Sequence, residues 1–463
     1  MILTDHSTNR KDYNGKQLVV AALKHERLPA VPWVPFAGVH AGRLKGYTAR
    51  EVLTDVGKLT ESLLAVHELY LPDGQPVVFD LQVEAEILGC SLLWSEDAPP
   101  SVADHPLETN PEIPTYLPES TNGRLPLILE ATRNLKQAVG ETTAIYGLIT
   151  GPFTLASHLR GTEVFMDMFD NPDYLHALMD YTTRVAERIA SFYIEAGVDV
   201  LAVVDPVVSQ ISQRHFSAFL SDPFSRLFGA IRQAGVLSSF FVCGNATKNL
   251  DVMCKTAPDG IAVDENIDLA AAKQVIDRYN ITVQGNIPLT TRMLLGTQQD
   301  NMAYVIDLFD QIEEIDRNLI LSPGCDMPYD TPVENVIGVA EAVRNPDMAR
   351  KVLQNYQAGT FDMAVSLPDY KNLPKPLVEV FTLDSSTCAA CGYMLNAAQR
   401  AVNEFGGRVD MFEYKMTSPE NVARLNAMGI KNLPSIVING ELKFSSLIPS
   451  NRELVAEIEK HLG

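Results

Sequence analysis

The sequence lacks the features that mark membrane, secreted and nucleic-acid-binding proteins. No stretch approaches the roughly 20 apolar residues that a membrane helix requires. Residues 1–24 carry several charges and no apolar core of the length found in signal peptides. Lysine and arginine form no run, and 58 acidic residues against 37 basic ones give a net charge of −21. We therefore expect a cytoplasmic protein with neither a membrane nor a nucleic acid as its partner.

Cysteine is also scarce. Six cysteines in 463 residues are too few and too scattered for the disulfide scaffold of a small secreted domain. We therefore expect cysteines that are reduced, bound to a metal or redox-active. An apolar content of 46% and a charged content of 21% are typical of a globular protein, and the length suffices for two or three domains.

Short apolar segments recur along the first three quarters of the chain. They are mostly β-branched and do not alternate with polar residues, as is typical of parallel strands that are buried on both faces. Helical patterns occupy most of the gaps between them, for example over Pro172–Ala196. The segments are Ala30–Phe36, Val77–Asp80, Thr143–Ile149, Val198–Asp205, Ser239–Cys243, Gly260–Asp264, Ile281–Asn286 and Asn318–Leu321.

Eight such strands with helices between them predict an α/β fold, a (β/α)8 TIM barrel, within residues 1–355. The alternative is an open, doubly wound sheet, but the sequence has no G-x-G-x-x-G phosphate loop. In a TIM barrel the catalytic groups lie at the C-terminal ends of the strands. Candidate residues follow most of the predicted strands at that end: His40, Arg43, Asp80, His158, Asp205, Cys243, Asp264, Glu265, Asn286 and Cys325.

The composition changes near Asn355. Residues 356–376 contain several prolines and little apolar content, and we interpret them as a linker. A new strand and helix pattern covers residues 377–463. It begins with the strand Val378–Leu383 and ends with a hairpin across Asn439-Gly440 and a helix. This order predicts a second, small α/β domain.

The Cys388-x-x-Cys391 pair is the most specific motif of the sequence. It lies directly after a strand at a helix N-terminus, where the partial positive charge favours the thiolate form of Cys388. This matches the thioredoxin-like redox arrangement, in which Pro434 would be a cis-proline beside the dithiol. The alternative is a structural pair or half of a metal site.

Two further cysteines end two distant strands of the predicted barrel. Cys243 follows the fifth strand, and Cys325 follows the eighth at a Pro-Gly turn. Because parallel strands end at the same mouth of a barrel, their thiols are predicted to share a soft metal ion such as zinc. The alternative is two buried core cysteines, since free cysteine is among the most buried residue types.

Carboxylates are concentrated after the second predicted strand. Asp80, Glu84 and Glu86 are candidates to orient a substrate or to act as general acid or base. For Glu84 and Glu86 a solvated or helix-capping position is the alternative. His158 is a candidate acid, base or ligand, although a lone histidine is more often a satisfied polar residue, and the same holds for His40.

Several of these segments together resemble the uroporphyrinogen decarboxylase superfamily over about residues 17–350. More narrowly, they look like its corrinoid-dependent methyltransferase branch, which includes the methylcobamide:thiol methyltransferases. The segments that carry the resemblance are Phe79-Asp80 with Val83–Glu86 and Leu88-Gly89, Gly151–Ser157, Cys243–Asn245, Asp264-Glu265 with Ile267–Leu269, Gln284–Asn286 and Ser322–Cys325.

The resemblance implies a methyltransferase that exchanges a methyl group between a corrinoid on a partner protein and a small-molecule donor or acceptor. The appended dithiol domain would keep the barrel cysteines reduced or pass electrons to the corrinoid system. On this interpretation the catalytic residues are Asp80, Glu84, His158 and Asp205, and the substrate-binding or cofactor-binding residues are His40, Arg43, Glu86, Asn245 and Asn286.

In the methyltransferases that the sequence resembles, a His-x-Cys motif and a distant cysteine hold zinc. Cys243 and Cys325 match the two cysteines, but Phe241 stands at the histidine position. A third ligand would have to come from elsewhere around the mouth, and without one the two cysteines act as thiols or form a disulfide. The candidates for that ligand are Asp264, Glu265, His158 and His40.

Two other functions stay open. True decarboxylases carry an Arg-Gln-Ala-Gly-Arg-Tyr loop, whereas the corresponding stretch Ala37–Gly46 keeps one arginine of the pair. His158 replaces their tyrosine, but Asp80 matches their catalytic aspartate, so a tetrapyrrole decarboxylase is the second interpretation. The third is a non-catalytic redox or corrinoid-binding accessory protein, which Phe241 favours.

Overall fold

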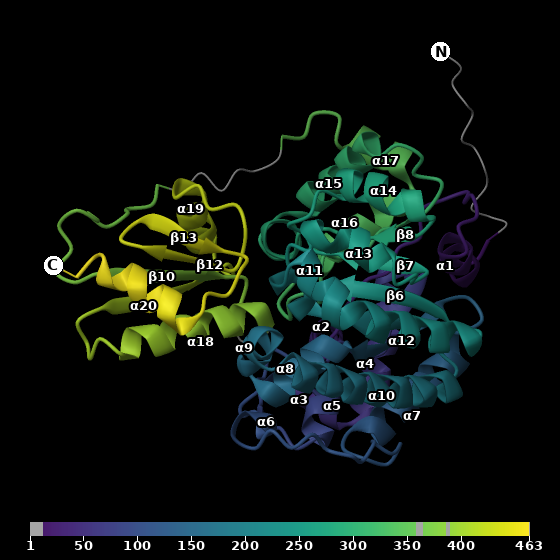
Figure 1. The fold of residues 1–463 in the computed structure, drawn as a ribbon. Coiled ribbons are helices and arrows are strands. Elements are labelled where there is room, and N and C mark those ends of the chain that lie inside the picture. Colours follow the sequence, from purple (N-terminus) through teal and green to yellow (C-terminus); the bar gives the residue numbers. More distant parts are fainter. Residues whose placement is uncertain (1–12, 358–363, 386–388, 463) are drawn as a thin grey trace. The chain divides into compact units, whose positions relative to one another are not determined.

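The structure is a computed structural model that describes residues 13–357, 364–385 and 389–462 (Figure 1). The chain divides near residue 358 into two compact units. The larger unit contains a seven-stranded sheet in the order β1–β4–β5–β6–β7–β8–β9 and a short two-stranded sheet, β2 (Leu92–Leu93) with β3 (Ser101–Val102), and the smaller unit contains a four-stranded sheet. No helix among the described residues is long and apolar enough to cross a membrane.

Every neighbouring pair of strands in the larger sheet is parallel, and helices cover its outer face (Figure 1). The strands are β1 (Gly74–Pro76), β4 (Ala144–Thr150), β5 (Val200–Val204), β6 (Leu237–Val242), β7 (Gly260–Val263), β8 (Thr282–Gln284) and β9 (Leu319–Ile320). The helices of this unit include α4 (Val56–Tyr70), α7 (Leu125–Val139), α10 (Pro172–Ala196), α12 (Ser221–Gln233), α14 (Leu269–Ile276), α15 (Gln298–Gln311) and α16 (Val333–Arg344).

An extended segment, residues 31–36, closes the sheet into a barrel. On one side, Val34 N donates a hydrogen bond to Leu321 O (2.9 Å), and on the other, Asp73 N donates to Trp33 O (2.8 Å). Two prolines in the segment have no N–H to donate, which explains why it forms a single isolated bridge, Trp33 with Leu321, instead of a full ladder. The predicted (β/α)8 barrel is confirmed, and the open sheet is excluded.

The second barrel strand lies earlier than the sequence predicts. β1 covers Gly74–Pro76, whereas the prediction was Val77–Asp80. Glycine and proline are poor strand formers, so the apolar pattern indicated the wrong residues. Gly74 is required because an atom of Tyr146 lies 2.7 Å from the position that a Cβ would occupy. Val77 N makes the last hydrogen bond to β4, to Tyr146 O (3.2 Å), and residues 78–80 then carry Asp80 to the mouth of the barrel.

Aromatic rings fill the barrel interior beneath the mouth. Phe36 packs edge to face against Phe79 and Phe241, at centroid distances of 6.0 and 4.9 Å, and Phe79 packs against Phe241 at 5.6 Å. Tyr146 joins Phe36 at 6.1 Å. These four buried rings form an apolar floor, because such contacts exclude water and stabilise beyond the area they bury. Polar chemistry is therefore confined to the mouth.

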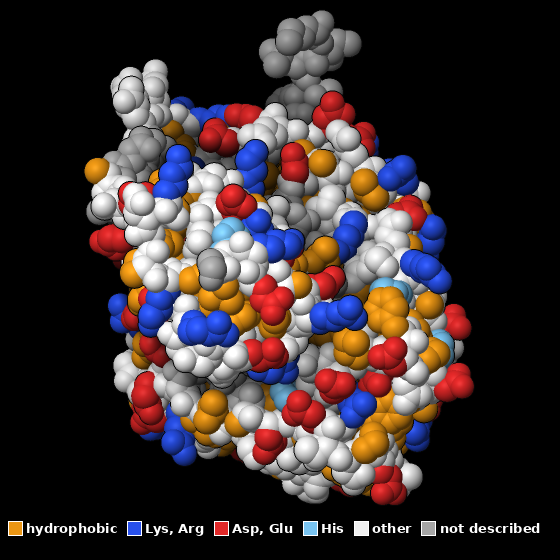
Figure 2. Space-filling view, turned by 60° about the vertical axis from the view of Figure 1, so that its left-hand side comes forward, with side chains coloured by type: hydrophobic (Ala, Val, Ile, Leu, Met, Phe, Trp, Pro, Cys, Tyr) orange, Lys and Arg blue, Asp and Glu red, His pale blue; other side chains and the backbone are white. Residues whose placement is uncertain are grey.

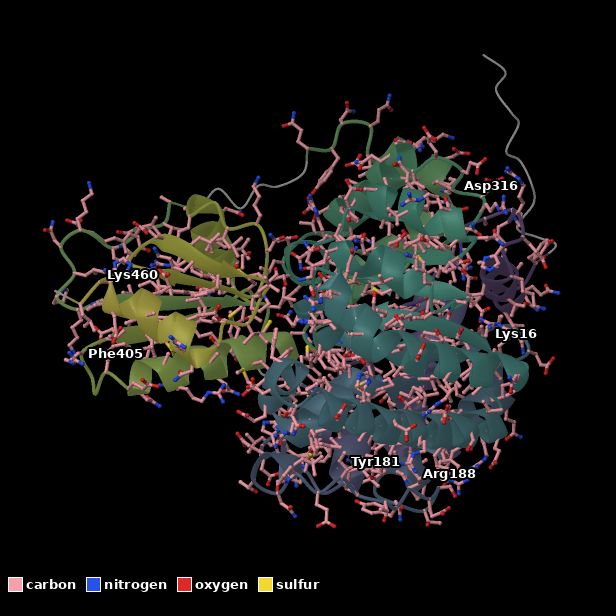
Figure 3. All side chains as sticks on the ribbon, in the orientation of Figure 1. Lys16, Tyr181, Arg188, Asp316, Phe405 and Lys460 are labelled. Atoms are coloured by element: carbon pink, nitrogen blue, oxygen red, sulfur yellow. A yellow bond between two sulfur atoms is a disulfide. The ribbon has the colours of Figure 1, made fainter. Side chains whose placement is uncertain are left out.

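A long connection leads from β3 (Ser101–Val102) to α7, and α10 holds it. Figure 3 labels the two residues of α10 that do so, Tyr181 and Arg188. The Tyr181 hydroxyl donates to Tyr116 O (3.1 Å), and Arg188 Nε donates to Pro118 O (3.2 Å). These contacts fix the segment that ends at Arg124, directly before α7.

The smaller unit has the strand and helix order of a thioredoxin-like fold. β10 (Leu377–Thr382) pairs in parallel with β11 (Asp410–Lys415) and antiparallel with β12 (Ser435–Ile438), which forms a hairpin with β13 (Glu441–Ser445). Figure 1 shows α18 (Ala389–Asn403) and α20 (Asn451–Glu459) on one face of this sheet and α19 (Pro419–Ala427) on the other. The predicted hairpin and the cis peptide bond before Pro434 are confirmed.

Successive side chains of β10 serve the two faces of that sheet. Val378 and Val380 belong to the core that α18 and α20 cover. Glu379 lies between them and points the other way, as the two-residue period of a strand requires, and it forms a buried ion pair with Arg424 of α19. The Tyr370 hydroxyl donates to Glu379 Oε2 (2.8 Å). Part of the predicted linker therefore packs as a component of the smaller unit.

Candidate functional site

Asp80 and Arg124 form a buried ion pair at the barrel mouth. Arg124 donates through Nη1 to Asp80 Oδ2 and through Nε to Glu86 Oε2 (2.7 Å), and Gln82 N donates to Asp80 Oδ1 (2.9 Å). Asp80 is 2% exposed and Arg124 8%. Burial lowers the pKa of Arg124, but the two carboxylates outweigh it and raise that pKa above its ordinary value. Arg124 therefore stabilises both carboxylates, of which Asp80 is buried and Glu86 is partly exposed.

Arg124 is a residue that the sequence did not single out. It lies 44 residues after Asp80 in a connecting segment, away from any strand end, so only the folded structure reveals the pair. Its guanidinium carbon lies 5.1 Å from the centre of the Trp94 ring. Its Nη2 is buried and has no hydrogen-bond partner among the described residues. Since buried polar atoms are usually paired, this atom is available to a bound ligand.

Asp326 is a second residue that sequence reasoning missed. Burial and then the charge of Asp80 raise its pKa well above the ordinary value, and its buried Oδ1 has no partner among the described residues. A Cβ at Gly38 would lie 2.0 Å from that oxygen, so only glycine fits there. The strand-end rule that selected Cys325 would also have selected Asp326, because the two residues are adjacent.

Glu84 holds the end of β4. Its Oε1 accepts from Thr150 N (2.9 Å), and its Oε2 lies 2.8 Å from Thr150 Oγ1. The same hydroxyl lies 2.9 Å from Leu81 O. One hydroxyl proton cannot serve two acceptors, so both contacts are satisfied when Glu84 is neutral and donates to Thr150. In agreement, burial raises the pKa of Glu84 to about 7.

This geometry predicts a pH dependence of stability. The pKa of Glu84 rises from 4.5 to about 7 on folding. Its contribution to the free energy of unfolding is therefore complete below pH 4.5 and is lost as the pH rises through about 7. Between these values Glu84 ionises only in the unfolded chain. Glu84→Gln keeps the neutral hydrogen bonds at all pH values. Relative to the variant, the wild type should therefore lose about 3 kcal/mol of unfolding free energy over that range.

Urea unfolding of both proteins at about pH 5 and about pH 8 measures this difference. The comparison cancels the pH dependence of every other group, because both proteins share those groups. If the difference in unfolding free energy between variant and wild type is the same at both pH values, Glu84 is ionised in the folded barrel and the proton assignment is wrong.

Asp205 is placed at the start of α8 (Pro152–Arg160). Its Oδ2 accepts from Phe153 N (2.9 Å), and its Oδ1 accepts from the N–H (3.0 Å) and hydroxyl (2.6 Å) of Thr154. Burial raises the pKa of Asp205 to about 7. A Cβ on Gly151 would lie 2.3 Å from Asp205. The structure thus uses Asp205 to position α8, and a catalytic role for it stays a prediction.

The two candidate histidines are buried and neutral. His40 Nδ1 lies 2.9 Å from Tyr329 O, and Nε2 lies 2.6 Å from the Tyr70 hydroxyl. Burial lowers the pKa of His40 to about 4 and that of His158 to about 3. Both ring nitrogens of His40 are therefore occupied, whereas His158 Nδ1 is buried without a partner among the described residues. Of the two, His158 is the better candidate for contact with a ligand.

The remaining predicted binding residues differ in how the structure uses them. Asn286 Nδ2 donates to two carbonyl oxygens, of Asp264 (2.8 Å) and Ile267 (2.6 Å). Asn245 Oδ1 accepts from the Thr247 hydroxyl (2.7 Å) and so shapes the loop after β6. Arg43 is half exposed and lies 3.4 Å from Asp330. Their roles in binding stay predictions.

The two mouth cysteines are bonded to each other. Cys243 and Cys325 form a disulfide with a Cα–Cα distance of 6.0 Å. Phe241, at the position of the expected histidine ligand, is buried in the aromatic floor. Of the predicted redox pair in the smaller unit, Cys391 is buried in the first turn of α18, and Cys388 lies outside the described residues.

The described residues do not fit the predicted zinc site. Asp264 accepts from Gly244 N (2.7 Å) and Asn266 N (2.9 Å), and Glu265 accepts from Leu289 N. In the part of the chain that the structure describes, no three His, Cys, Asp or Glu side chains are grouped so that they could hold a metal. A structural zinc ion needs four ligands and a catalytic one three, so we derive no step through zinc.

Comparisons with known proteins agree with both units. The profile of the family "Uroporphyrinogen decarboxylase (URO-D)" matches residues 14–346, and the profile "Thioredoxin domain" matches residues 377–459. Methylcobamide:CoM methyltransferase MtbA of Methanosarcina acetivorans is 28% identical over 341 residues, which cover 72% of this chain and 98% of MtbA.

Two further comparisons concern the alternative function and the fold. A uroporphyrinogen decarboxylase of Trichodesmium erythraeum is 26% identical over 299 residues, which cover 63% of this chain and 82% of that enzyme. The solved structure of a methyltransferase from Methanosarcina mazei superposes with a TM-score of 0.66 at 26% identity, and the match covers 72% of this chain and 99% of that structure.

Proposed function

The chain belongs to the uroporphyrinogen decarboxylase family, and from this premise we propose that its barrel transfers a methyl group between a corrinoid on a partner protein and a small molecule. The observation that carries the proposal is the correspondence with MtbA, which extends over 98% of that methyltransferase. The mouth suits the reaction, because an apolar aromatic floor lies beneath a cluster of ionisable groups. That cluster comprises Asp80, Glu86, Arg124 and Asp326.

In the forward direction, a small nucleophile such as a thiol takes the methyl group, and the cobalt–carbon bond breaks with its electron pair on cobalt. The nucleophile must first lose its proton. We assign Asp80 as the proton acceptor and Arg124, through its unpartnered Nη2, as the group that orients the small molecule. Glu86 holds Arg124 in place through Nε.

Methylcobalamin and a panel of small thiols, coenzyme M included, test the proposal under anaerobic conditions. We expect cob(I)alamin in the absorption spectrum and the methylated thiol by mass spectrometry, at a rate proportional to enzyme and at least about 100-fold lower in Asp80→Ala. The reverse direction is tested with cob(I)alamin and methylated thiols. Absence of turnover in both directions, with the mouth cysteines reduced, would contradict the proposal.

Decarboxylation of a tetrapyrrole is the alternative, and one observation favours it: Asp80 occupies the mouth as the resemblance to the decarboxylases implies. Against it, the single arginine of α2 (His40–Arg43) faces solvent and pairs with Asp330. The same enzyme preparation incubated with uroporphyrinogen distinguishes the two functions, because only a decarboxylase releases carbon dioxide and products with fewer carboxylates.

We further propose that the smaller unit is a dithiol donor, which passes electrons to the cysteines of the barrel mouth. This rests on the match of residues 377–459 to the thioredoxin profile and on the spacing of Cys388 and Cys391.

A further inference from the structure

We propose that Cys243 and Cys325 are a redox-active pair that cycles between disulfide and dithiol by exchange with a dithiol. This pair replaces a metal site at the barrel mouth. The inference goes beyond methyl transfer, because it assigns a two-electron reaction to the barrel itself. It rests on the placement of the two sulfurs, on the surroundings of Phe241 and on the state of the other described cysteines.

The disulfide spans the mouth instead of joining neighbouring strands. Cys243 follows β6 and Cys325 follows β9, and β7 and β8 lie between these two strands in the sheet. The cysteines are 82 residues apart in sequence. Both are only partly buried where they pack against the barrel core. A reductant can therefore approach the bond from the side on which substrates enter.

The surroundings of the pair favour sulfur chemistry over metal binding. Cys243 and Cys325 pack against the core cluster that contains Phe241, and the Phe241 ring packs on Phe36 and Phe79. The third ligand of a metal site is thus replaced by an apolar ring. Asp264 and Glu265, two of the predicted substitutes, accept hydrogen bonds from main-chain N–H groups.

The other barrel cysteines are unsuited to exchange. Cys90 and Cys254 are buried, and burial raises the pKa of each thiol to about 12. The Cys90 thiol also donates to His158 O (3.4 Å). The thiolate is the reactive form, so these two thiols are inert at neutral pH. Among the described residues of the barrel, only the mouth pair is available.

The reaction balances with a dithiol as the reductant. One thiolate of the dithiol attacks a sulfur of the Cys243–Cys325 bond, that bond breaks, and the other cysteine leaves as a thiolate that takes a proton. The second thiol of the reductant then displaces the first barrel cysteine from the mixed disulfide. Two electrons and two protons move to the barrel, and the reductant becomes a disulfide.

Thiol labelling of the full chain tests the proposal. The variant Cys388→Ser/Cys391→Ser isolates the barrel, because four of the six cysteines remain. The native protein is oxidised with oxidised dithiothreitol, treated with N-ethylmaleimide before or after reduction by dithiothreitol, and analysed by peptide mass spectrometry. We expect no label before reduction and two labels after it, on Cys243 and Cys325, with Cys90 and Cys254 labelled only after denaturation.

Two further measurements keep the test independent of any variant that fails to fold. The labelled fraction of the wild-type mouth pair, titrated in buffers of reduced and oxidised dithiothreitol, should follow one two-electron transition. Metal analysis of the reduced, zinc-supplied protein should find far less than one zinc per chain. About one tightly bound zinc, or two free mouth thiols under fully oxidising conditions, would overturn the proposal. Neither readout uses methyl transfer, so each proposal can fail alone.

Discussion

Replacing Arg124 by methionine should destabilise the barrel by about 3–5 kcal/mol, the cost of leaving a buried charge without its partner. The variant removes the donor to Asp80 Oδ2 and the donor to Glu86 together. Asp80 then keeps one hydrogen bond, from Gln82 N, for a charge that is 2% exposed. The loss is a large fraction of the 5–15 kcal/mol that typically stabilises a domain.

Urea unfolding followed by tryptophan fluorescence measures this loss. Both tryptophans of the chain, Trp33 and Trp94, lie in the larger unit, so the signal reports that unit alone. The matched control is Arg184→Met in α10, which breaks an exposed pair with Asp180 (3.1 Å). Exposed pairs contribute at most about 1 kcal/mol, so this variant should stay close to the wild type.

A double variant separates the ion pair from simple packing. Asp80→Asn removes the negative charge and keeps an acceptor for Gln82 N, so adding it to Arg124→Met should recover part of the lost stability. If the loss of unfolding free energy in Asp80→Asn/Arg124→Met equals the sum of the losses in the two single variants, the two side chains do not interact. The buried ion pair would then not be the source of the stability lost in Arg124→Met.

The fold could be predicted from the sequence because its strands are buried on both faces. Uninterrupted apolar runs such as Val200–Val204 mark β5 without help from other elements. Where backbone hydrogen bonding and not apolarity determines the pairing of strands, the sequence pattern was misleading. The strand β1 contains glycine and proline, and the segment 31–36 forms only one isolated bridge. A sequence pattern shows which residues are buried but not which N–H groups find a partner.

Only part of the barrel mouth could be predicted from the sequence. The strand-end rule located Asp80 and the two cysteines, because parallel strands must end together. It could not locate Arg124, which a long connection held by Tyr181 and Arg188 delivers to Asp80. Nor could it distinguish carboxyls that are occupied by main-chain donors, as in Asp205, from one with an unpartnered oxygen, as in Asp326.

Electrostatics on the surface differs from electrostatics at the mouth. On the face shown in Figure 2, acidic and basic side chains are interspersed, and the chain as a whole carries a net charge of −21. Exposed charges of this kind are screened by salt. At the mouth, burial instead raises the pKa of several carboxyls, among them Glu84 to about 7 and Glu265 to about 8. Perturbed groups of this kind are enriched at functional sites.

The variant Cys388→Ser/Cys391→Ser should restore the barrel thiols after oxidation at a rate at least ten-fold lower than that of the wild type. A dithiol at a helix N-terminus has a lowered thiol pKa and reacts rapidly as thiolate, whereas the Cys243–Cys325 disulfide of the variant has no dithiol of its own chain to exchange with. The protein is oxidised, and NADPH with thioredoxin reductase then supplies electrons. Labelling of Cys243 and Cys325 against time measures recovery.

Excess dithiothreitol is the control, since it should restore the thiols of the variant completely and so show that its barrel is intact. The way in which the recovery rate of the wild type depends on protein concentration then identifies the donor. If the smaller unit of the same chain reduces the barrel, the rate is independent of protein concentration, because the exchange is then intramolecular. A rate proportional to concentration indicates exchange between molecules, and equal recovery in variant and wild type would contradict a donor role for the smaller unit.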